Sequence, residues 1–319
     1  MNISVLGCGR WGTFISWYLS NHKHQVIQWG RESSASFNQL LNYRKNDYVE
    51  LNEDVFLTCD LEKAISSSSV IIISINSQNL RDLLSKVVKY PIDNKIFILC
   101  MKGVEVDTGK RLTEVAVDCG IDINNLAIWV GPGHIQAFTQ GLPNCMLIDS
   151  RNKNLTKKIA DAFRSDLIRF YYGDDLIGSE IGAAAKNVMG IAAGMLDGGG
   201  YSTLKGALMA RGAREVSRLI KTMGGNELSA YGLCHLGDYE ATVFSKYSHN
   251  RMFGEKFILG EKYEHLAEGY YTVKALMTLS ERYDVELPIC KAVYDILYLN
   301  KEPKETLSKL FSREKKSEF

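Results

Sequence analysis

The chain has 319 residues, of which 45% are hydrophobic and 24% are charged, a composition typical of a soluble globular protein with two domains. Its formal net charge is only +1, which gives no electrostatic reason to expect nucleic acid or an anionic membrane as a partner. The seven cysteines are scattered and include no CxxC pair, which favours reduced thiols in a cytoplasm over a disulfide framework or a zinc site. No basic leader precedes the first predicted strand, so we expect neither a signal peptide nor a membrane anchor.

The N-terminal segment has the pattern of a dinucleotide-binding turn. Residues 2–6 are predicted as a strand and 13–19 as a helix, and a GxGxxG sequence lies between them. In this motif the first glycine makes a tight turn, the second lets the backbone approach a pyrophosphate, and the third lets the helix pack on the strand. The helix N-terminus then faces the phosphates. The predicted cofactor-binding residues are Gly7, Gly9, Arg10, Trp11 and Gly12.

The end of the second predicted strand, 25–29, bears on the choice of cofactor. A site for NAD usually has an acidic residue here that binds the ribose hydroxyl, but this chain continues Gly30-Arg31-Glu32. Arg31 would hold the 2′-phosphate of NADP, whereas Glu32 leaves NAD open, and Arg31 also fits a solvated loop. We therefore predict NADP or NAD, with a lean towards NADP from Arg31.

Three further apolar runs are typical of parallel strands covered on both faces: 70–75, 95–100 and 126–130. Ser77, Lys102 and His134 follow these runs, at the sheet edge where a doubly wound fold binds its ligand. Lys102 and His134 are also compatible with loop positions of no catalytic role, and no ligand spacing supports a metal site. Strands alternating with helical stretches predict a Rossmann domain over residues 1–178.

The segment 180–197 consists almost entirely of small or apolar residues, with Lys186 and Asn187 in its middle. It is too short and too charged for a membrane span, so we predict a buried helix whose glycines and alanines let other backbones approach. An ionised amine is not left unpaired in an apolar interior. Lys186 is therefore either paired with a structural carboxylate or snorkelling, or it is a proton donor at a reacting carbonyl.

Strand patterns are absent after residue 178, which predicts an all-helical second domain over 179–319. Its other helices are predicted at 203–223, 268–283, 288–298 and 304–311. The expected fold class is α/β: a doubly wound Rossmann sheet followed by a helical domain. We also expect the helix of Lys186 to lie against the ligand-binding edge of the sheet.

A polar segment, 236–254, lies between those helices and gathers hydrogen-bond donors. Donors in number suit a phosphate or a carboxylate, and Asp238 would orient Lys186 or a substrate hydroxyl. The segment is also compatible with a solvated loop and the start of a helix. Its candidate binding residues are Thr242, Lys246, His249, Asn250 and Arg251.

In order and spacing, these segments resemble the NAD(P)-dependent glycerol-3-phosphate dehydrogenases of the bacterial, soluble type, over essentially the whole chain. The resemblance rests on the glycine turn and on these motifs: Asn76-Ser-Gln-Asn-Leu-Arg81, Lys102-Gly103-Val-Glu105, Gly131-Pro132, Gly141-Leu-Pro143, Ala185-Lys-Asn-Val188, Gly194-Met-Leu-Asp-Gly198, Arg211-Gly212, Gly237-Asp238, Asn250-Arg-Met-Phe-Gly254 and Ala267-Glu268-Gly269.

The resemblance implies reversible reduction of dihydroxyacetone phosphate to sn-glycerol 3-phosphate, a precursor of phospholipids. By that likeness Lys186 is the general acid and base, and Lys102 and Asp238 line the reacting end. Asn187 and Thr242 hold the substrate, with His134 as a further candidate. The segment His249-Asn250-Arg251 meets the substrate phosphate or the cofactor pyrophosphate, and Glu268 lies near the cofactor. We expect a small phosphorylated substrate, a homodimer, and no metal.

The chain departs from the family pattern at three positions near the inferred cleft. His249 stands where the family usually has arginine, Ala137 lies in a loop that lacks an expected acidic group, and Asn76 replaces a proline. Histidine is shorter than arginine and only partly charged near neutrality. Two other functions therefore stay open: a related dehydrogenase acting on another small hydroxy or keto compound, and a dinucleotide-binding regulator without catalysis.

Overall fold

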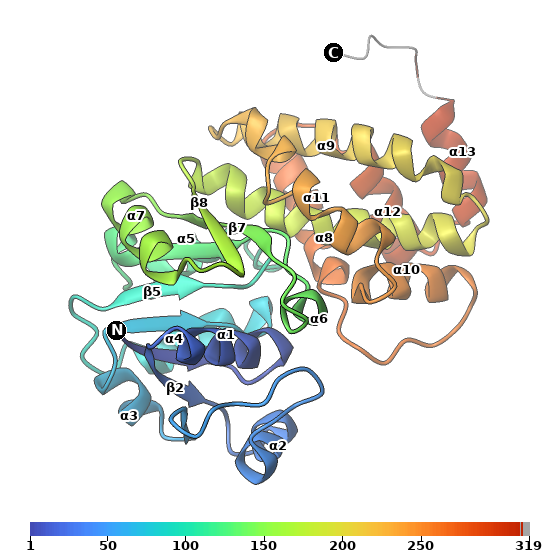
Figure 1. The fold of residues 1–319 in the computed structure, drawn as a ribbon. Helices are drawn as coiled ribbons and strands as arrows, with labels where there is room; N and C mark the ends of the chain where they lie inside the picture. Colours follow the sequence, from blue (N-terminus) through green and yellow to red (C-terminus); the bar gives the residue numbers. More distant parts are fainter. Residues whose placement is uncertain (313, 315–319) are drawn as a thin grey trace. The chain divides into compact units, whose positions relative to one another are not determined.

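The computed structural model describes residues 1–312 and 314. It divides into two compact units (Figure 1). The first contains Met1–Lys102 and Lys110–Glu180, and the second contains Gly103–Gly109 and the chain from Ile181 onward. The division after Glu180 falls close to residue 178, and a short segment from the middle of the N-terminal half belongs to the second unit.

The first unit is built on an eight-stranded sheet in the order β3-β2-β1-β4-β5-β6-β7-β8. Neighbouring strands are parallel except β6 and β7, which pair antiparallel. The strands are β1 (Asn2–Leu6), β2 (Gln25–Trp29), β3 (Phe56–Thr58), β4 (Val70–Ile73), β5 (Ile96–Leu99), β6 (Leu126–Val130), β7 (Asn144–Asp149) and β8 (Ile168–Tyr172). The order through β6 is that of a Rossmann sheet, which confirms the predicted fold class.

The core strands of this sheet are buried as their composition predicts. Every residue of β4 and β5 is buried, as expected of apolar parallel strands that are covered on both faces. The helices of this unit are α1 (Arg10–Asn21), α2 (Ala35–Tyr43), α3 (Leu61–Ser66), α4 (Leu80–Val87), α5 (Leu112–Asp118), α6 (Ile135–Phe138), α7 (Lys153–Phe163) and the start of α8 (Leu176–Gly198).

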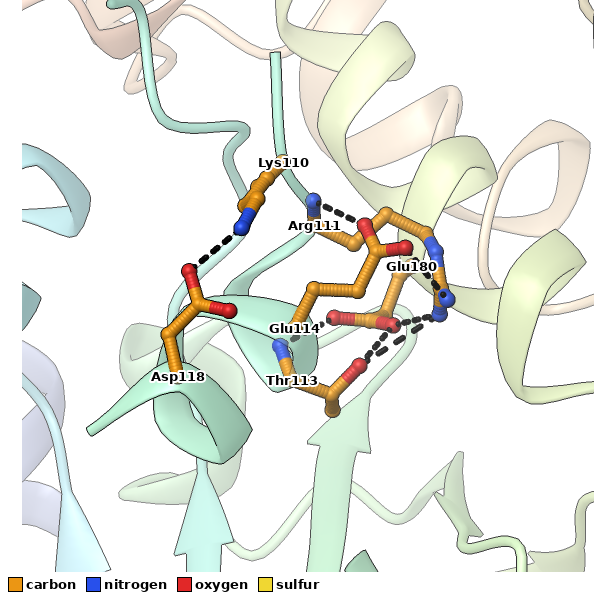
Figure 2. A network of polar contacts seen from close by, with 6 residues as sticks. All are labelled: Lys110, Arg111, Thr113, Glu114, Asp118 and Glu180. Carbon is orange, nitrogen blue, oxygen red and sulfur yellow. Dashed lines mark hydrogen bonds and ion pairs between the residues drawn. The ribbon is translucent and has the colours of Figure 1, made fainter. Parts of the chain in front are cut away.

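A buried carboxylate joins the start of α8 to the start of α5 (Figure 2). Glu180 accepts hydrogen bonds from Arg111 Nη1 at 2.6 Å, from the Thr113 amide at 2.9 Å and from Thr113 Oγ1 at 2.6 Å. Glu114 in turn accepts from the Arg111 amide at 2.8 Å, which caps α5. Both carboxylate oxygens of Glu180 are thus satisfied, as a buried charge requires.

Among its described residues the second unit is built from helices, turns and loops, and it contributes no strand to the sheet. Besides most of α8 it contains α9 (Lys205–Thr222), α10 (His249–Ile258), α11 (Glu268–Arg282), α12 (Pro288–Leu299) and α13 (Pro303–Phe311). Short turns link α9 to α10, among them η5 (Leu236–Asp238) and the π-helical turn η6 (Glu240–Phe244). In Figure 1 α8 runs between α9 and α10. The predicted helical domain is confirmed.

Glycines bring α8 and α10 into backbone contact. A Cβ atom on Gly194 would lie 1.9 Å from the carbonyl oxygen of Arg251, and one on Gly254 would lie 2.1 Å from the carbonyl oxygen of Ile191. Real Cβ atoms do not approach other atoms so closely, so only glycine fits at either position. The small residues of α8 therefore hold α10, with its polar N-terminal residues, against the helix that carries Lys186.

Candidate active site

The glycine turn of the first unit is shaped for a close approach from outside. Gly7 has φ +117°, and a Cβ there would lie 2.1 Å from the Ser74 carbonyl oxygen. A Cβ on Gly12 would lie 2.0 Å from the Gly7 carbonyl oxygen, so strand and helix touch at these two positions. Gly9, by contrast, is exposed and has no atom within 4 Å of its Cβ position. It begins α1 without a side-chain cap, so the residues present fit a pyrophosphate at the helix N-terminus.

The turn after β2 has no place for an acidic side chain directly at the strand end. A Cβ on Gly30 would lie 2.4 Å from the Phe37 ring, and the exposed Arg31 comes next. Cys8 Sγ lies 3.4 Å from Ser34 Oγ, which joins this turn to the glycine turn. Burial raises the pKa of the Cys8 thiol, and the hydrogen bond with Ser34 and the Arg31 charge partly oppose that rise.

The other predicted residues of the first unit lie at strand ends, as expected. Ser77 is buried and begins a short turn after β4, while His134 precedes α6. Lys102 Nζ donates to the Gly131 carbonyl oxygen at 2.9 Å, so the loops after β5 and β6 are joined. Trp11 stacks on a neighbouring ring of α1, and Arg10 lies over an aromatic ring in the chain beyond α2. The ligand contacts of all these residues stay predictions.

The Lys186 ammonium of the second unit is buried with a carboxylate and a hydroxyl. Nζ lies 2.7 Å from Asp238 Oδ2 and donates to Thr242 Oγ1 at 2.9 Å. The three residues are 8%, 1% and 2% exposed. Asp238 and Thr242 come from η5 and η6, so these turns supply the partners of the α8 amine. The structure thus brings together the three residues that the sequence singled out separately.

Asn187 of α8 and Asn250 of α10 form a second polar contact. Asn250 Nδ2 donates to Asn187 Oδ1 at 3.1 Å, and its Oδ1 accepts from the Gly269 amide at 2.9 Å. A Cβ on Gly269 would lie 2.6 Å from the Asn187 carbonyl oxygen. Asn250 therefore bridges α8 to the first turn of α11, where Glu268 is the first residue.

Arg251 and His249 both have partners in the protein. Arg251 Nε donates to Asp197 Oδ2 at 2.7 Å, and Lys205 Nζ lies 2.6 Å from the same oxygen. His249 Nδ1 and the Tyr263 hydroxyl share a hydrogen bond of 2.5 Å. A phosphate at Arg251 would share its guanidinium with Asp197. The binding roles of His249 and Arg251 stay predictions.

The sequence did not predict that Asp197 pairs with Arg251. It also gave no role to His235 and Tyr239, which flank Asp238 along the chain. His235 and Tyr239 are completely buried. Their only sequence signal is a histidine and a tyrosine spaced by four residues around Asp238. Within residues 1–312 and 314, no group of three or more histidine, cysteine or acidic side chains is arranged to hold a metal ion. No helix in that part of the chain is long and apolar enough to cross a membrane.

Comparison with known families covers nearly the whole chain. Residues 2–156 match the model for the N-terminus of NAD-dependent glycerol-3-phosphate dehydrogenase, and residues 175–308 match the model for its C-terminus. The chain belongs to the NAD-dependent glycerol-3-phosphate dehydrogenase family. It is accordingly an oxidoreductase with a site for NAD or NADP.

Individual members of this family are similar over their full length. A glycerol-3-phosphate dehydrogenase [NAD(P)+] of Chlorobium phaeobacteroides is 34% identical over 100% of this chain and 99% of its own. One from Staphylococcus aureus is 33% identical over 99% of both chains. The crystal structure of glycerol-3-phosphate dehydrogenase from Coxiella burnetii superposes with a TM-score of 0.88 at 25% identity, over 98% of this chain and 99% of that one.

Proposed function

We propose that this protein catalyses the reversible NAD(P)H-dependent reduction of dihydroxyacetone phosphate to sn-glycerol 3-phosphate, which supplies glycerophospholipid synthesis. Family membership over the whole chain supports the reaction. The observation that carries the assignment to residues is the buried contact of Lys186 Nζ with Asp238 and Thr242. A dehydrogenase of this family needs a proton donor at the ketone oxygen, and the Lys186 amine fits that role.

A nicotinamide cofactor, when bound, would supply the hydride, and the protein side chains would stabilise the charge that develops on the substrate oxygen. The Asp238 carboxylate at 2.7 Å favours the ammonium form of Lys186, because opposite charges at that distance stabilise each other. An ammonium beside the developing alkoxide neutralises it and donates a proton to the oxygen. In the reverse direction the neutral amine takes the proton from the hydroxyl. Thr242 Oγ1, which accepts from Nζ, directs the amine.

The experiment that tests this function is a substrate panel with NADPH and NADH, followed by absorbance. Dihydroxyacetone phosphate should be reduced with either cofactor, and Lys186→Ala should lower kcat by about 10²- to 10⁴-fold. Lys221→Ala is the matched control, because Lys221 is an exposed lysine paired with Glu227 on the surface of the same unit. Turnover by Lys186→Ala at the level of this control would remove the amine from the chemistry.

We further infer a preference for NADP, because Gly30 excludes an acidic side chain at the end of β2 and the exposed Arg31 follows it directly. Arg31→Glu should then reverse the preference between NADPH and NADH. An unchanged ratio of kcat/KM for the two cofactors would refute the 2′-phosphate contact. A cytoplasmic location and a homodimer complete the proposal, and size-exclusion chromatography with light scattering tests the dimer.

A related dehydrogenase of another small hydroxy or keto compound is the second candidate. The contacts of Arg251 with Asp197 and of His249 with Tyr263 favour it, because both side chains predicted at the phosphate already have partners. Turnover of another ketone, with none of dihydroxyacetone phosphate, would select this candidate. The buried contact of Lys186 with Asp238 and Thr242 argues against a regulator without catalysis, since such a regulator needs no buried proton donor.

A further inference from the structure

A buried histidine and a buried tyrosine flank Asp238, the partner of Lys186, along the chain. His235 immediately precedes η5, Tyr239 immediately follows it, and neither side chain is exposed to solvent. His235 Nδ1 lies 2.8 Å from the carbonyl oxygen of Gly182, and its Nε2 lies 2.7 Å from the Tyr239 hydroxyl. Both ring nitrogens therefore have a partner inside the protein.

The partners determine where the imidazole proton is. A carbonyl oxygen only accepts, so Nδ1 must carry the proton that is donated to Gly182. Nε2 of the neutral ring is then an acceptor, and the Tyr239 hydroxyl donates to it. Burial lowers the pKa of His235 to about 4, and the Lys186 charge adds to that effect. The ring is thus uncharged near neutrality, which suits a position beside an ammonium.

The contact between His235 and Gly182 joins α8 to the segment that carries Asp238 and Thr242. Gly182 lies one helical turn before Lys186 in α8, and its carbonyl oxygen is the one to which the Lys186 amide donates in a regular helix. A Cβ on Gly182 would lie 3.1 Å from His235 Cβ, so the missing side chain leaves room for the histidine. Asp238 and Thr242 follow His235 along the chain, and both contact Lys186 Nζ.

We propose that His235 and Tyr239 are positioning residues that hold Asp238 and Thr242 in register with Lys186 for proton transfer. The proposal rests on the proposed dehydrogenase function and extends it to two side chains outside the reacting centre. The hydrogen bond to Gly182 fixes the start of η5 on the α8 backbone, one turn before Lys186, and thereby supports the contacts that η5 and η6 make with Nζ. Small displacements of a catalytic group cost large factors in rate, so the anchor is expected to act on kcat more than on binding.

The first test is Tyr239→Phe, with Tyr298→Phe as matched control. Each variant removes one tyrosine hydroxyl from the helical unit, and the Tyr298 hydroxyl donates to the Tyr270 carbonyl oxygen at 2.8 Å, not to His235. Tyr239→Phe should lower kcat for dihydroxyacetone phosphate about 10- to 100-fold and leave KM for the cofactor within about twofold, and the control should keep the wild-type kcat. Equal kcat in wild type and Tyr239→Phe, or an equal loss in the control, would overturn the proposal.

The pH profile separates positioning from a general loss of stability. Lys186 and Asp238 face His235, and Glu215 and Cys290 face Tyr239, so these are the charged or titratable groups that the change can affect. Tyr239→Phe should shift the pH dependence of kcat, because the distance between Lys186 and Asp238 sets the basicity of the amine. A merely destabilised enzyme would keep the wild-type profile at lower amplitude, and that result would overturn the proposal.

A second pair of variants tests the histidine itself. Asn at position 235 keeps an N–H donor for the Gly182 carbonyl oxygen, whereas Ala removes it, so His235→Asn should recover at least about tenfold of the kcat lost in His235→Ala. Equal activity of the two variants would contradict the anchor.

Nitrogen NMR of the wild-type protein should show the proton of His235 on Nδ1 from pH 6 to 8. A proton on Nε2 would refute the inference whatever the enzyme catalyses. Failure of the proposed function, in contrast, appears as a wild-type protein that does not reduce dihydroxyacetone phosphate.

Discussion

The buried pair of Lys186 and Asp238 predicts an unusual relation between stability and activity. Its atoms are 2.7 Å apart, and the two side chains are only 10% and 1% exposed. Removing one partner leaves a buried charge without compensation, which costs about 3–5 kcal/mol, whereas removing both is often nearly neutral. We therefore expect Lys186→Met and Asp238→Asn each to destabilise the protein more than the double variant does.

The magnitude is large enough to measure by thermal unfolding. For a unit of this size, 1 kcal/mol corresponds to a change in Tm of about 2–4 °C, so each single variant should lose about 6–20 °C. The double variant should recover at least half of that loss. All variants that lack Lys186 should nevertheless have kcat about 10²- to 10⁴-fold below wild type, because the proton donor is gone.

The recovery of stability without recovery of activity distinguishes a proton donor from a structural lysine. A double variant less stable than both single variants would show that the pair is not a buried charge pair of the kind described. Lys186→Met with wild-type kcat would show that the amine only balances the Asp238 charge. Thermal unfolding by circular dichroism and initial rates on the same samples give both results.

Three other changes test the packing and the charges around the site. Gly194→Ala would place a Cβ 1.9 Å from a carbonyl oxygen of α10 and should cost about 3 kcal/mol of stability, whereas Gly206→Ala, with no atom within 4 Å, should cost nothing measurable. Glu180→Gln should lose about 3 kcal/mol in denaturant unfolding, because Arg111, whose side chain is 13% exposed, would keep only the more exposed Glu114, at 3.3 Å, of its two carboxylate partners. Burial raises the pKa of Asp149 from 3.8 to about 6, so the wild-type protein loses stability as pH rises through that interval. Asp149→Asn should therefore stabilise the protein by up to about 3 kcal/mol at pH 8 but not at pH 4.

Each of these three expectations has a result that would contradict it. Equal Tm values for Gly194→Ala and Gly206→Ala would mean that α8 and α10 separate at no cost. A Glu180→Gln protein as stable as wild type would mean that the network of Figure 2 does not stabilise the junction of α5 and α8. For Asp149→Asn, a stabilisation that is the same at pH 4 and pH 8 would show that ionisation of the carboxyl is not its cause.

The elements predicted best from the sequence are those whose pattern is local. The glycine turn, the apolar strands and the long buried helix each depend on residues within one short segment, and the structure places all of them. The strands at the two edges of the sheet, β3 on one side and β7 and β8 on the other, were not predicted from the sequence. The strand 144–149 has polar residues at both ends, and three of its six positions are only partly buried, so its composition does not separate it from a loop. Nothing local signals that it runs antiparallel to β6.

Contacts between distant segments could not be predicted in the same way. The segment Gly103–Gly109 belongs to the helical unit although it follows a strand of the sheet, and no composition change marks it. The pairing of Arg251 with Asp197 joins residues 54 positions apart. Either residue alone has the pattern of a solvated charge, so the sequence favoured a phosphate contact for Arg251 over an internal partner.

The glycines of α8 explain why one helix can hold so much of the site. Gly182, Gly190 and Gly194 lie at intervals of four and eight residues from Lys186, and positions four apart lie on one face of a helix. A Cβ at these glycines would lie 3.1 Å from His235, 2.8 Å from Thr242 Cγ2 and 1.9 Å from the carbonyl oxygen of residue 251, respectively. Lys186 is thus the one residue with a side chain in a row of glycines spaced four apart along α8. The turns and α10 can approach that face only because its neighbours are glycines, and their approach is what encloses the amine with a carboxylate and a hydroxyl.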